Sequence, residues 1–256
     1  MSTPDLDLAL RLADTADAVT LPRFRAADLR VTRKPDRTPV TDADTAAEAA
    51  LRAANGAERT DDTVLGEEEG GDVADTGRGW VLDPIDGTKN FSRGLPVWAT
   101  LIGLTVDGTP AVGVVSAPAL GRRWWGATGH GAWTTDSPGA PPRRIRVSAV
   151  ADLADAYLST TDFRSFTADS WTRLATAVWE TRAFGDFWQY CLVAEGAVDV
   201  AVDAGASPWD LAALVPILAE AGGRLTSLAG ADTFRGGDGI ATNGVLHEQA
   251  LKTLAS

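Results

Sequence analysis

Cysteine and histidine are nearly absent from the 256 residues of this chain. The single cysteine, Cys191, excludes a disulfide within the chain and suits a reducing compartment, and its apolar neighbours predict a place in the core. The two histidines, His130 and His247, exclude a zinc site built from several histidines and are predicted to be packing or surface residues. Oxygen must therefore supply most ligands of any bound metal, which favours hard cations such as Mg²⁺ or Mn²⁺.

Positive charge and long apolar runs are scarce as well. The net charge of −12 argues against nucleic acid or an anionic membrane as a partner, because both require a basic face. No apolar run approaches the roughly 20 residues that cross a bilayer, and residues 1–12 lack the basic start and apolar stretch of a signal peptide. With 45% hydrophobic and 23% charged residues, we expect a soluble globular protein of the cytoplasm.

The pattern of apolar residues changes along the chain and predicts two lobes, at residues 1–140 and 141–256. In the first lobe it predicts helices at 4–20 and 42–55, a polar loop at 33–39, and an antiparallel meander of strands at 98–106, 111–115 and 122–127. Residues 136–142 are rich in turn formers and mark the boundary. In the second lobe, strands near 156–160 and 197–202 alternate with helices near 163–179, 186–195 and 209–221, which favours an α/β layer.

The stretch from Trp80 to Asn90 is the most informative in the chain. Its first three residues are apolar and predict a short buried strand, which Pro84 should end just after Asp83. In the turn that follows, Asp86 can return to the side of Asp83, and Gly87 has no Cβ to keep a phosphate from nearby backbone amides. Carboxylates beside free amides suit a cation and an anion together. The alternative is a simple tight turn.

Three further acidic residues stand beside predicted helix starts or strand ends. Asp44 falls in the first turn of a helix that Thr41 caps, Glu67 follows a short apolar run, and Asp210 precedes an apolar helical stripe. Each has a structural alternative: a helix-dipole carboxylate for Asp44, a solvated loop for Glu67 and an N-cap for Asp210. Pro216 lies within the last helix and predicts a kink there.

These four acidic segments, taken in order, resemble the inositol monophosphatase family over nearly the whole chain. The resemblance implies an α+β or α/β protein with a layered α-β-α-β-α sandwich, of the type shared with fructose-1,6-bisphosphatase. It also implies a homodimer, dependence on Mg²⁺ with Mn²⁺ as a possible substitute, and sensitivity to lithium.

The resemblance further implies a role for each matching residue. Glu67, Asp83 and the carbonyl of Ile85 would hold a first Mg²⁺, Asp83, Asp86 and Asp210 a second, and a third, weaker ion would touch Glu67. Thr88, hydrogen-bonded to Asp44, would orient the water that attacks phosphorus. The amides of Gly87 and Thr88 would bind phosphate oxygens.

Substrate choice depends on residues further along the chain. Gly185-Asp186 stands where many family members have Gly-Ser or Gly-Thr, and Asp203 stands where inositol phosphatases typically have Glu. Within the family the chain most resembles the bacterial histidinol-phosphate phosphatases. An added carboxylate would favour a cationic substrate such as histidinol phosphate over the neutral hydroxyls of inositol phosphate. The alternative for Asp186 is that it caps its own helix. Asp86 and Asp210 complete the predicted substrate-binding set.

We therefore predict a Mg²⁺-dependent phosphomonoesterase of histidine biosynthesis that hydrolyses a small-molecule ester, L-histidinol phosphate. Inositol 1-phosphate and 3′-phosphoadenosine 5′-phosphate are alternative substrates within the same reaction class. A non-catalytic phosphate- or metal-binding module is the alternative from a different class. Thr88 and Asp44 disfavour it, because their implied roles act on water rather than on ion binding.

Overall fold

The computed structural model describes residues 3–35 and 37–255. Up to residue 144 the elements are α1 (Pro4–Arg23), β1 (Val31–Arg33), β2 (Pro39–Thr41), α2 (Asp42–Glu58), β3 (Thr63–Gly66), β4 (Gly70–Gly71), β5 (Arg78–Asp86), α3 (Thr88–Ser92), β6 (Ala99–Val106), β7 (Thr109–Ala117), β8 (Arg122–Ala127), β9 (Ala132–Thr135) and β10 (Arg143–Arg144). Then follow β11 (Tyr157–Ser159), α4 (Ala168–Ala177), β12 (Glu180–Arg182), α5 (Asp186–Ala194), β13 (Val200–Asp203), α6 (Pro208–Leu211), α7 (Leu214–Ala221), β14 (Arg224–Thr226), β15 (Gly239–Thr242) and α8 (His247–Ala255), with short 3₁₀ turns at Leu153–Asp155 and Phe163–Ser165.

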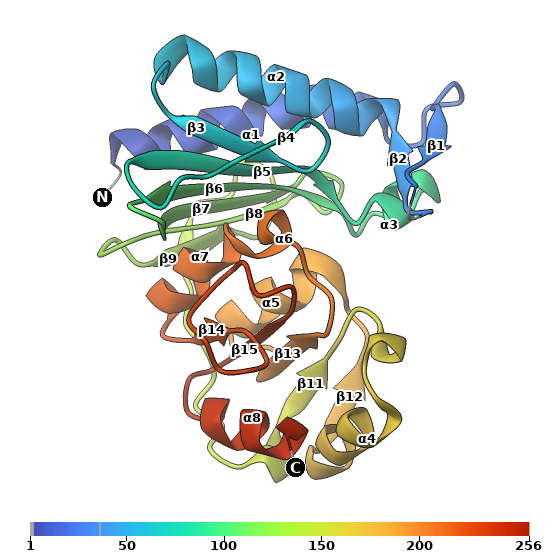
Figure 1. The fold of residues 1–256 in the computed structure, drawn as a ribbon, viewed down its shortest axis with the longest axis vertical. Coiled ribbons are helices and arrows are strands. Elements are labelled where there is room, and N and C mark those ends of the chain that lie inside the picture. Colours follow the sequence, from blue (N-terminus) through green and yellow to red (C-terminus); the bar gives the residue numbers. More distant parts are fainter. Residues whose placement is uncertain (1–2, 36, 256) are drawn as a thin grey trace.

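The elements stack in alternating layers of helix and sheet (Figure 1). Helices α1 and α2 cover an eight-stranded sheet with the strand order β10-β9-β8-β7-β6-β5-β3-β4. Helices α5, α6 and α7 separate it from a five-stranded sheet with the order β12-β11-β13-β15-β14, whose far face carries α4 and α8. The predicted layered sandwich is confirmed.

Most predicted elements are present, with local differences. Thr3 and Thr41 cap α1 and α2, and the predicted antiparallel meander forms β6, β7 and β8. The loop predicted at 33–39 is the tip of the β1–β2 hairpin. The prediction of one helix at 163–179 is wrong. A 3₁₀ turn ends at residue 165, and Thr167 caps a separate helix, α4. The helix predicted at 209–221 is divided into α6 and α7.

The division between α6 and α7 follows from Pro216. Its ring nitrogen carries no hydrogen, so it cannot donate to the carbonyl of Ala212 one helical turn earlier. Ala212 and Ala213 keep helical dihedral angles, and the regular hydrogen-bond ladder is interrupted there. The predicted kink thus takes the form of two short helices, the second of which ends at Gly222 in the left-handed conformation.

The expectation that Pro84 ends its strand is wrong, because β5 continues to Asp86 through a bulge. Asp83 pairs with Leu101 and Asp86 pairs with Ala99, so three steps along β5 match two steps along β6. A bulge leaves residues out of the ladder, which is why a proline without an N–H is tolerated at this point. The carbonyl of Pro84 instead accepts a hydrogen bond from Thr100 Oγ1 at 2.8 Å.

A row of three glycines brings the middle helices against the backbone of the large sheet. Gly103, Gly113 and Gly126 are direct neighbours on β6, β7 and β8. A Cβ atom on Gly113 would lie 1.8 Å from the carbonyl oxygen of Ala213, and one on Gly126 would lie 2.9 Å from Ile217 Cα. No side chain fits between helix and sheet at these positions. Glycine is therefore required here for close approach rather than for a turn.

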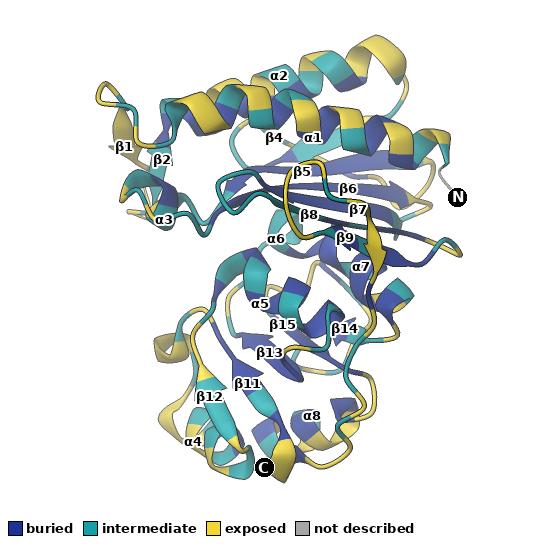
Figure 2. Ribbon diagram, turned by 180° about the vertical axis from the view of Figure 1, so that it is seen from behind, coloured by how far each residue is buried: buried dark blue, intermediate teal, exposed yellow. Residues whose placement is uncertain are grey.

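Apolar clusters fill the spaces between the layers, and Figure 2 shows buried residues running through both sheets and the helix faces turned toward them. Cys191 and His247 are buried, as predicted for packing residues, and the imidazole lies between the hydroxyls of Thr226 and Thr242. No helix in residues 3–35 and 37–255 is long and apolar enough to cross a membrane. The two-lobe division at 140/141 stays a prediction, and its outer limits at residues 1 and 256, like Asp36 of the predicted loop, lie outside the described residues.

We expect Gly113→Ala to lower the free energy of unfolding by about 1–3 kcal/mol, because the added methyl group would push against the α7 backbone. Urea denaturation measures this. Gly56→Ala in α2 is the matched control: its added Cβ meets no atom within 4 Å, and it should raise stability by up to about 1 kcal/mol. Equal stability of the two variants would show that the glycine row is not a close contact.

Candidate functional site

The bulge in β5 places Asp83 and Asp86 on one side of the sheet. Residues three apart in a regular strand point to opposite faces, because side chains alternate with a period of two. Here the partners of Asp83 and Asp86, Leu101 and Ala99, are two apart and share a face, so both carboxylates do too. The side chains that the sequence predicted to converge through a turn converge through a strand irregularity.

Asp210 approaches the carboxylates of Asp83 and Asp86 from the layer of helices beside the large sheet. The residues that follow α6, Ala212 and Ala213, lie against Gly103 of the glycine row. Asp210 accepts a hydrogen bond from the N–H of Ser207 at 2.7 Å, which closes a capping box. Asp210 therefore occupies the third position of its helix, and Ser207 is the N-cap. One oxygen from each of Asp83, Asp86 and Asp210 lies within 4.8 Å of the others.

Three carboxylates at this separation repel one another and fit a cation. Burial, followed by the neighbouring charges, raises the pKa of Asp83 and of Asp86 well above the ordinary range, and burial raises the pKa of Asp210 to about 7. Asp83 Oδ1 is buried and accepts no hydrogen bond from the described residues. An unpartnered buried carboxylate oxygen among other carboxylates is a typical ligand for a hard metal ion.

Glu67 lies at the edge of this cluster. β3 pairs in parallel with β5 so that Gly66 stands opposite Leu82, and the next residues, Glu67 and Asp83, emerge side by side. Glu67 does not lie in a freely solvated loop, which was the alternative. Lys34 Nζ lies 2.7 Å from Glu67 Oε1 and 2.8 Å from Glu68 Oε1. Burial raises the pKa of Glu68 to about 7.

Asp44 and Thr88 form a hydrogen-bonded pair behind the cluster. Asp44 is fully buried, and its Oδ2 accepts from the Thr41 N–H at 2.8 Å and the Thr41 hydroxyl at 2.5 Å. Its Oδ1 lies 3.0 Å from Thr88 Oγ1, which also lies 2.9 Å from the carbonyl oxygen of Ile85. Burial raises the pKa of Asp44 above its ordinary value. Asp44 is thus a proton acceptor that Thr88 can reach.

Gly87 turns the chain from β5 into the short helix α3. Its φ of 84° is in the left-handed region, and an added Cβ would lie 2.9 Å from the carbonyl oxygen of Val97. Both facts require glycine. The first amides of α3, beginning with Thr88, have no acceptor within the helix and can donate to an anion.

The cluster opens into a pocket of about 870 Å³. It is lined by Glu67, Asp86, Gly87, Thr88, Asp186, Asp203 and Asp210 among the predicted site residues. Asp44, Asp83 and Ile85 lie buried behind this surface. Every predicted site residue is therefore at the pocket wall or directly behind it, although Asp186 and Asp203 come from the C-terminal half of the chain.

Asp203 and Asp186 differ in their surroundings. Asp203 is only 7% exposed and accepts hydrogen bonds from Thr161, Gln189 and Tyr190, at 2.6 to 3.1 Å. From the described residues Asp186 accepts one hydrogen bond, from Asn90 Nδ2 at 2.9 Å. The alternative that Asp186 caps its own helix is wrong, because Gly185 is the N-cap and Asp86 Oδ2 accepts the Phe187 N–H at 2.5 Å.

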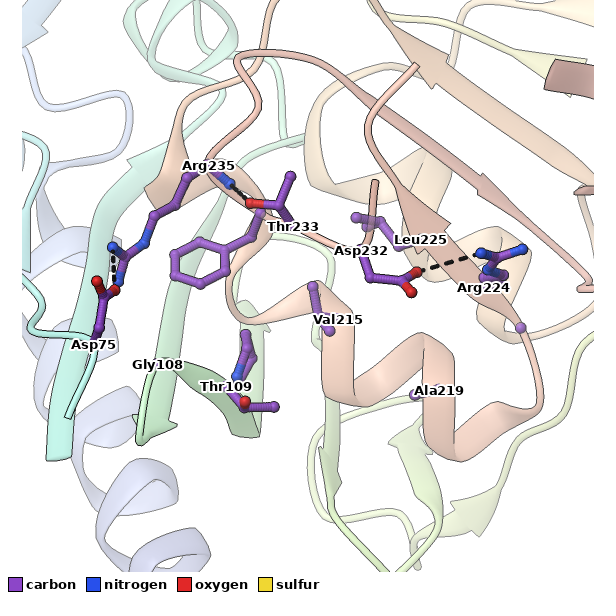
Figure 3. Close-up of a pocket in the computed structure, with 13 residues that line it drawn as sticks. Asp75, Gly108, Thr109, Val215, Ala219, Arg224, Leu225, Asp232, Thr233 and Arg235 are labelled. Atoms are coloured by element: carbon purple, nitrogen blue, oxygen red, sulfur yellow. Dashed lines mark hydrogen bonds and ion pairs between the residues drawn. The ribbon is translucent and has the colours of Figure 1, made fainter. Parts of the chain in front are cut away.

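A second cavity, of about 430 Å³, lies between α7, β14 and the β6–β7 turn (Figure 3). Its acids already face arginines: Asp75 lies 3.0 Å from Arg235 and Asp232 lies 3.5 Å from Arg224. All four side chains are more than a third exposed. The larger pocket, which has free amides in its wall and the unpartnered Asp83 Oδ1 behind it, is therefore the candidate site.

Glu48 is a site residue that the sequence reasoning missed. Its buried carboxylate accepts the N–H groups of Glu68 at 2.7 Å and Glu69 at 3.0 Å, and so shapes the loop that carries Glu67. A Cβ on Gly66 would lie 2.0 Å from Glu48 Oε1. One signal was available: Glu48 is four residues after Asp44, on the same face of α2.

An acidic cluster that fits a metal ion, beside an anion-binding turn in a layered sandwich, defines a metal-dependent phosphatase acting on small-molecule phosphate esters. The chain matches the Inositol monophosphatase family over residues 2–256. It is 55% identical to a histidinol-phosphatase of Mycobacterium tuberculosis, over 99% of both chains, and 49% identical to one of Streptomyces coelicolor, over 96% of this chain and 95% of the other. A solved IMPase of Thermotoga maritima is 29% identical, with a TM-score of 0.87 over 99% of this chain and 97% of the other. This chain belongs to the inositol monophosphatase family.

Glu48→Gln is expected to lower the free energy of unfolding by about 1–3 kcal/mol. One carboxylate oxygen that accepts a backbone N–H would be replaced by an amide NH₂, which cannot accept it. Hydrogen exchange at the Glu68 amide should become faster. The control is Glu58→Gln, whose exposed carboxylate pairs with Arg11 at 2.7 Å and should contribute at most about 1 kcal/mol. An unchanged exchange rate at Glu68 would contradict the role given to Glu48.

Proposed function

We propose that this phosphatase hydrolyses L-histidinol phosphate to L-histidinol and phosphate, a step of histidine biosynthesis. The observation that carries the proposal is the carboxylate of Asp186, which lies at the wall of the pocket beside the phosphate-binding turn: its Oδ2 would be 3.4 Å from a Cβ on Gly87. A carboxylate so close to a phosphate is unfavourable unless the ester brings a positive charge. Histidinol phosphate carries an ammonium group and an ionisable imidazole. The names of the two similar bacterial enzymes support the same substrate.

We propose Mg²⁺ as the metal, with Mn²⁺ as a possible substitute. Glu67, Asp83 and the Ile85 carbonyl would hold one ion, Asp83, Asp86 and Asp210 a second, and a third, weaker ion would touch Glu67. When bound, the metal supplies a water of lowered pKa and neutralises charge on the phosphate and on the leaving oxygen. The donor set fits, because it consists of oxygens only and includes the unpartnered Asp83 Oδ1. Because the chain has a net charge of −12, attraction of the phosphate must come from this local site.

The chain's own residues position the phosphate and move the proton. The amides of Gly87 and Thr88 donate to phosphate oxygens. Thr88 Oγ1 accepts a hydrogen bond from the attacking water while its own proton points to Asp44 Oδ1, 3.0 Å away. As the water attacks phosphorus, its proton passes to Thr88 and the hydroxyl proton of Thr88 passes to Asp44. The P–O bond to the alcohol breaks in the same step, and the leaving oxygen takes its proton from solvent. The raised pKa of the buried Asp44 makes it a better acceptor for that proton.

We also propose that the protein acts as a homodimer in the cytoplasm. The strand β12 is an edge strand, and Trp179, the residue before it, is 69% exposed, which suits a surface that a second copy covers. The single buried cysteine suits a reducing compartment. Sedimentation equilibrium at the mass of one 26.8 kDa chain would contradict the dimer.

Phosphate release should require both the metal and its carboxylate ligands. We expect a chelator to abolish turnover, Mg²⁺ to restore it, and Asp86→Asn to lower kcat about a hundredfold or more. Asp61→Asn, the same change at an exposed position, is the control and should leave kcat unchanged. Initial rates on L-histidinol phosphate, inositol 1-phosphate, 3′-phosphoadenosine 5′-phosphate and fructose 1,6-bisphosphate test the activity. Turnover of none of these esters, or near-normal activity of Asp86→Asn, would show that the site is wrongly assigned.

Asp186→Ser tests the substrate. We expect it to lower kcat/KM for L-histidinol phosphate about tenfold more than for inositol 1-phosphate, because a charge-assisted contact of roughly 1.5–3 kcal/mol is lost only with the cationic ester. Steady-state kinetics with both esters measure the ratio. Equal losses on the two substrates would mean that Asp186 does not select between them.

A further inference from the structure

We propose that Asn90 is a positioning residue that sets the carboxylate of Asp186 for a cationic group on the substrate. The inference rests on the proposed function, in which Asp186 faces such a group. It concerns a residue beyond the predicted set, one that belongs to α3, directly after the phosphate-binding turn. The class of substrate that the pair would recognise is a phosphate monoester of a small amino alcohol, with its positive charge near the ester.

The side-chain amide of Asn90 makes two fixed contacts. Nδ2 donates to the carbonyl oxygen of Val97 at 2.8 Å and to Asp186 Oδ2 at 2.9 Å. Both amide protons are therefore used, which holds the side chain in one orientation. Among the described residues, Oδ1 of Asp186 accepts no hydrogen bond. One carboxylate oxygen is anchored and the other is available to a ligand.

The backbone of Asp186 is held as firmly as its side chain. Its φ of 48° lies in the left-handed region, and it follows Gly185, whose φ is 72°. Its N–H donates to Thr161 Oγ1 at 2.8 Å. A residue other than glycine is uncommon in this conformation and persists only where the surroundings impose it. Asn90 and Thr161 therefore hold Asp186 from two sides, and all three line the pocket.

The protein itself leaves the charge of Asp186 unpaired. No lysine or arginine nitrogen of the described residues lies within 4.0 Å of the Asp186 carboxylate. Elsewhere in the described part of the chain, 22 ion pairs meet this distance. Lys89 lines the same pocket and attracts Asp186 only from a greater distance. Because its hydrogen-bond donor is a neutral amide, a cation on the ligand would be the first direct ion partner of Asp186.

Asn90 also supports the chain at Val97, so a purely structural role must be separated from a positioning one. If the Val97 contact were the one that matters for activity, Asn90→Ala would disturb the turn at Gly87 and harm every ester alike. Loss of the Asp186 contact would harm only a cationic ester. The two roles therefore differ in substrate selectivity and in the energetic coupling between Asn90 and Asp186.

The experiment is a double-mutant cycle on the Mg²⁺-loaded protein with Asn90→Ala, Asp186→Ala and the double variant. KM and kcat are measured for L-histidinol phosphate and for inositol 1-phosphate. We expect Asn90→Ala to raise KM for L-histidinol phosphate about tenfold, with kcat changed by less than about twofold and inositol 1-phosphate little affected. In the Asp186→Ala background, Asn90→Ala should have no further effect on KM. Ser92→Ala, a change at a partly exposed position on the same helix, is the control.

The outcomes separate this inference from the proposed function. If the unaltered protein does not prefer L-histidinol phosphate, the proposed substrate fails and the inference fails with it. If it does, and Asn90→Ala retains the preference or weakens both esters equally, only the role of Asn90 is overturned. Additive effects of the two substitutions would overturn it too. Thermal unfolding checks that each variant folds. If Asn90→Ala does not fold, Asn90→Ser replaces it, and the same kinetic result is expected of that variant.

Discussion

The close contact of α6 and α7 with the bare backbone of β6, β7 and β8 is the constraint on which the site depends. Gly103, Gly113 and Gly126 stand side by side in the sheet, and the helix backbone approaches where side chains would otherwise keep it away. Asp210 is carried on α6, so the depth of this contact sets its distance from Asp83 and Asp86. A sheet with larger side chains at these positions would hold the third carboxylate away from the other two.

Electrostatics opposes the same arrangement. No cation from the described residues lies among Asp83, Asp86 and Asp210, and burial strengthens their repulsion because the interior screens charge less than water does. The packing of the layers, the capping box at Ser207 and the bond from Phe187 to Asp86 hold them in place. A metal ion would relieve the repulsion, so ion binding and folding stability are coupled at this site. Lys34, beside Glu67 and Glu68, partly offsets the negative charge at its edge.

Much of the fold was predictable from local pattern. The capped helices α1 and α2 and the meander β6–β8 follow from periodicity and turn residues, and the layered sandwich followed from the family resemblance. Two of the errors arose where a proline was considered alone. Pro84 lies in a bulge within β5, and Pro216 divides one helix into two, because the neighbouring strand and sheet decide whether a missing N–H ends an element.

The functional residues divide in the same way. Asp186 was visible in the sequence as a carboxylate in place of serine or threonine, but its partner Asn90 is 96 positions away and meets it only across the pocket. Glu48 was similarly hidden, because nothing in an alanine-rich helix shows which distant amides its carboxylate accepts. Hydrogen bonds between segments far apart in sequence leave no local pattern.

The sequence by itself determined which chemical groups are present: oxygen ligands, a glycine turn with free amides, an added carboxylate and no cluster of soft ligands. These are properties of residue types and their immediate neighbours. Only the tertiary structure decided which of the 35 acidic residues meet, through the bulge in β5, the parallel register of β3 with β5 and the glycine row beneath α7. The physical reason is that ligand distances of a few ångströms are set by strand register and packing depth, which arise between segments and not within them.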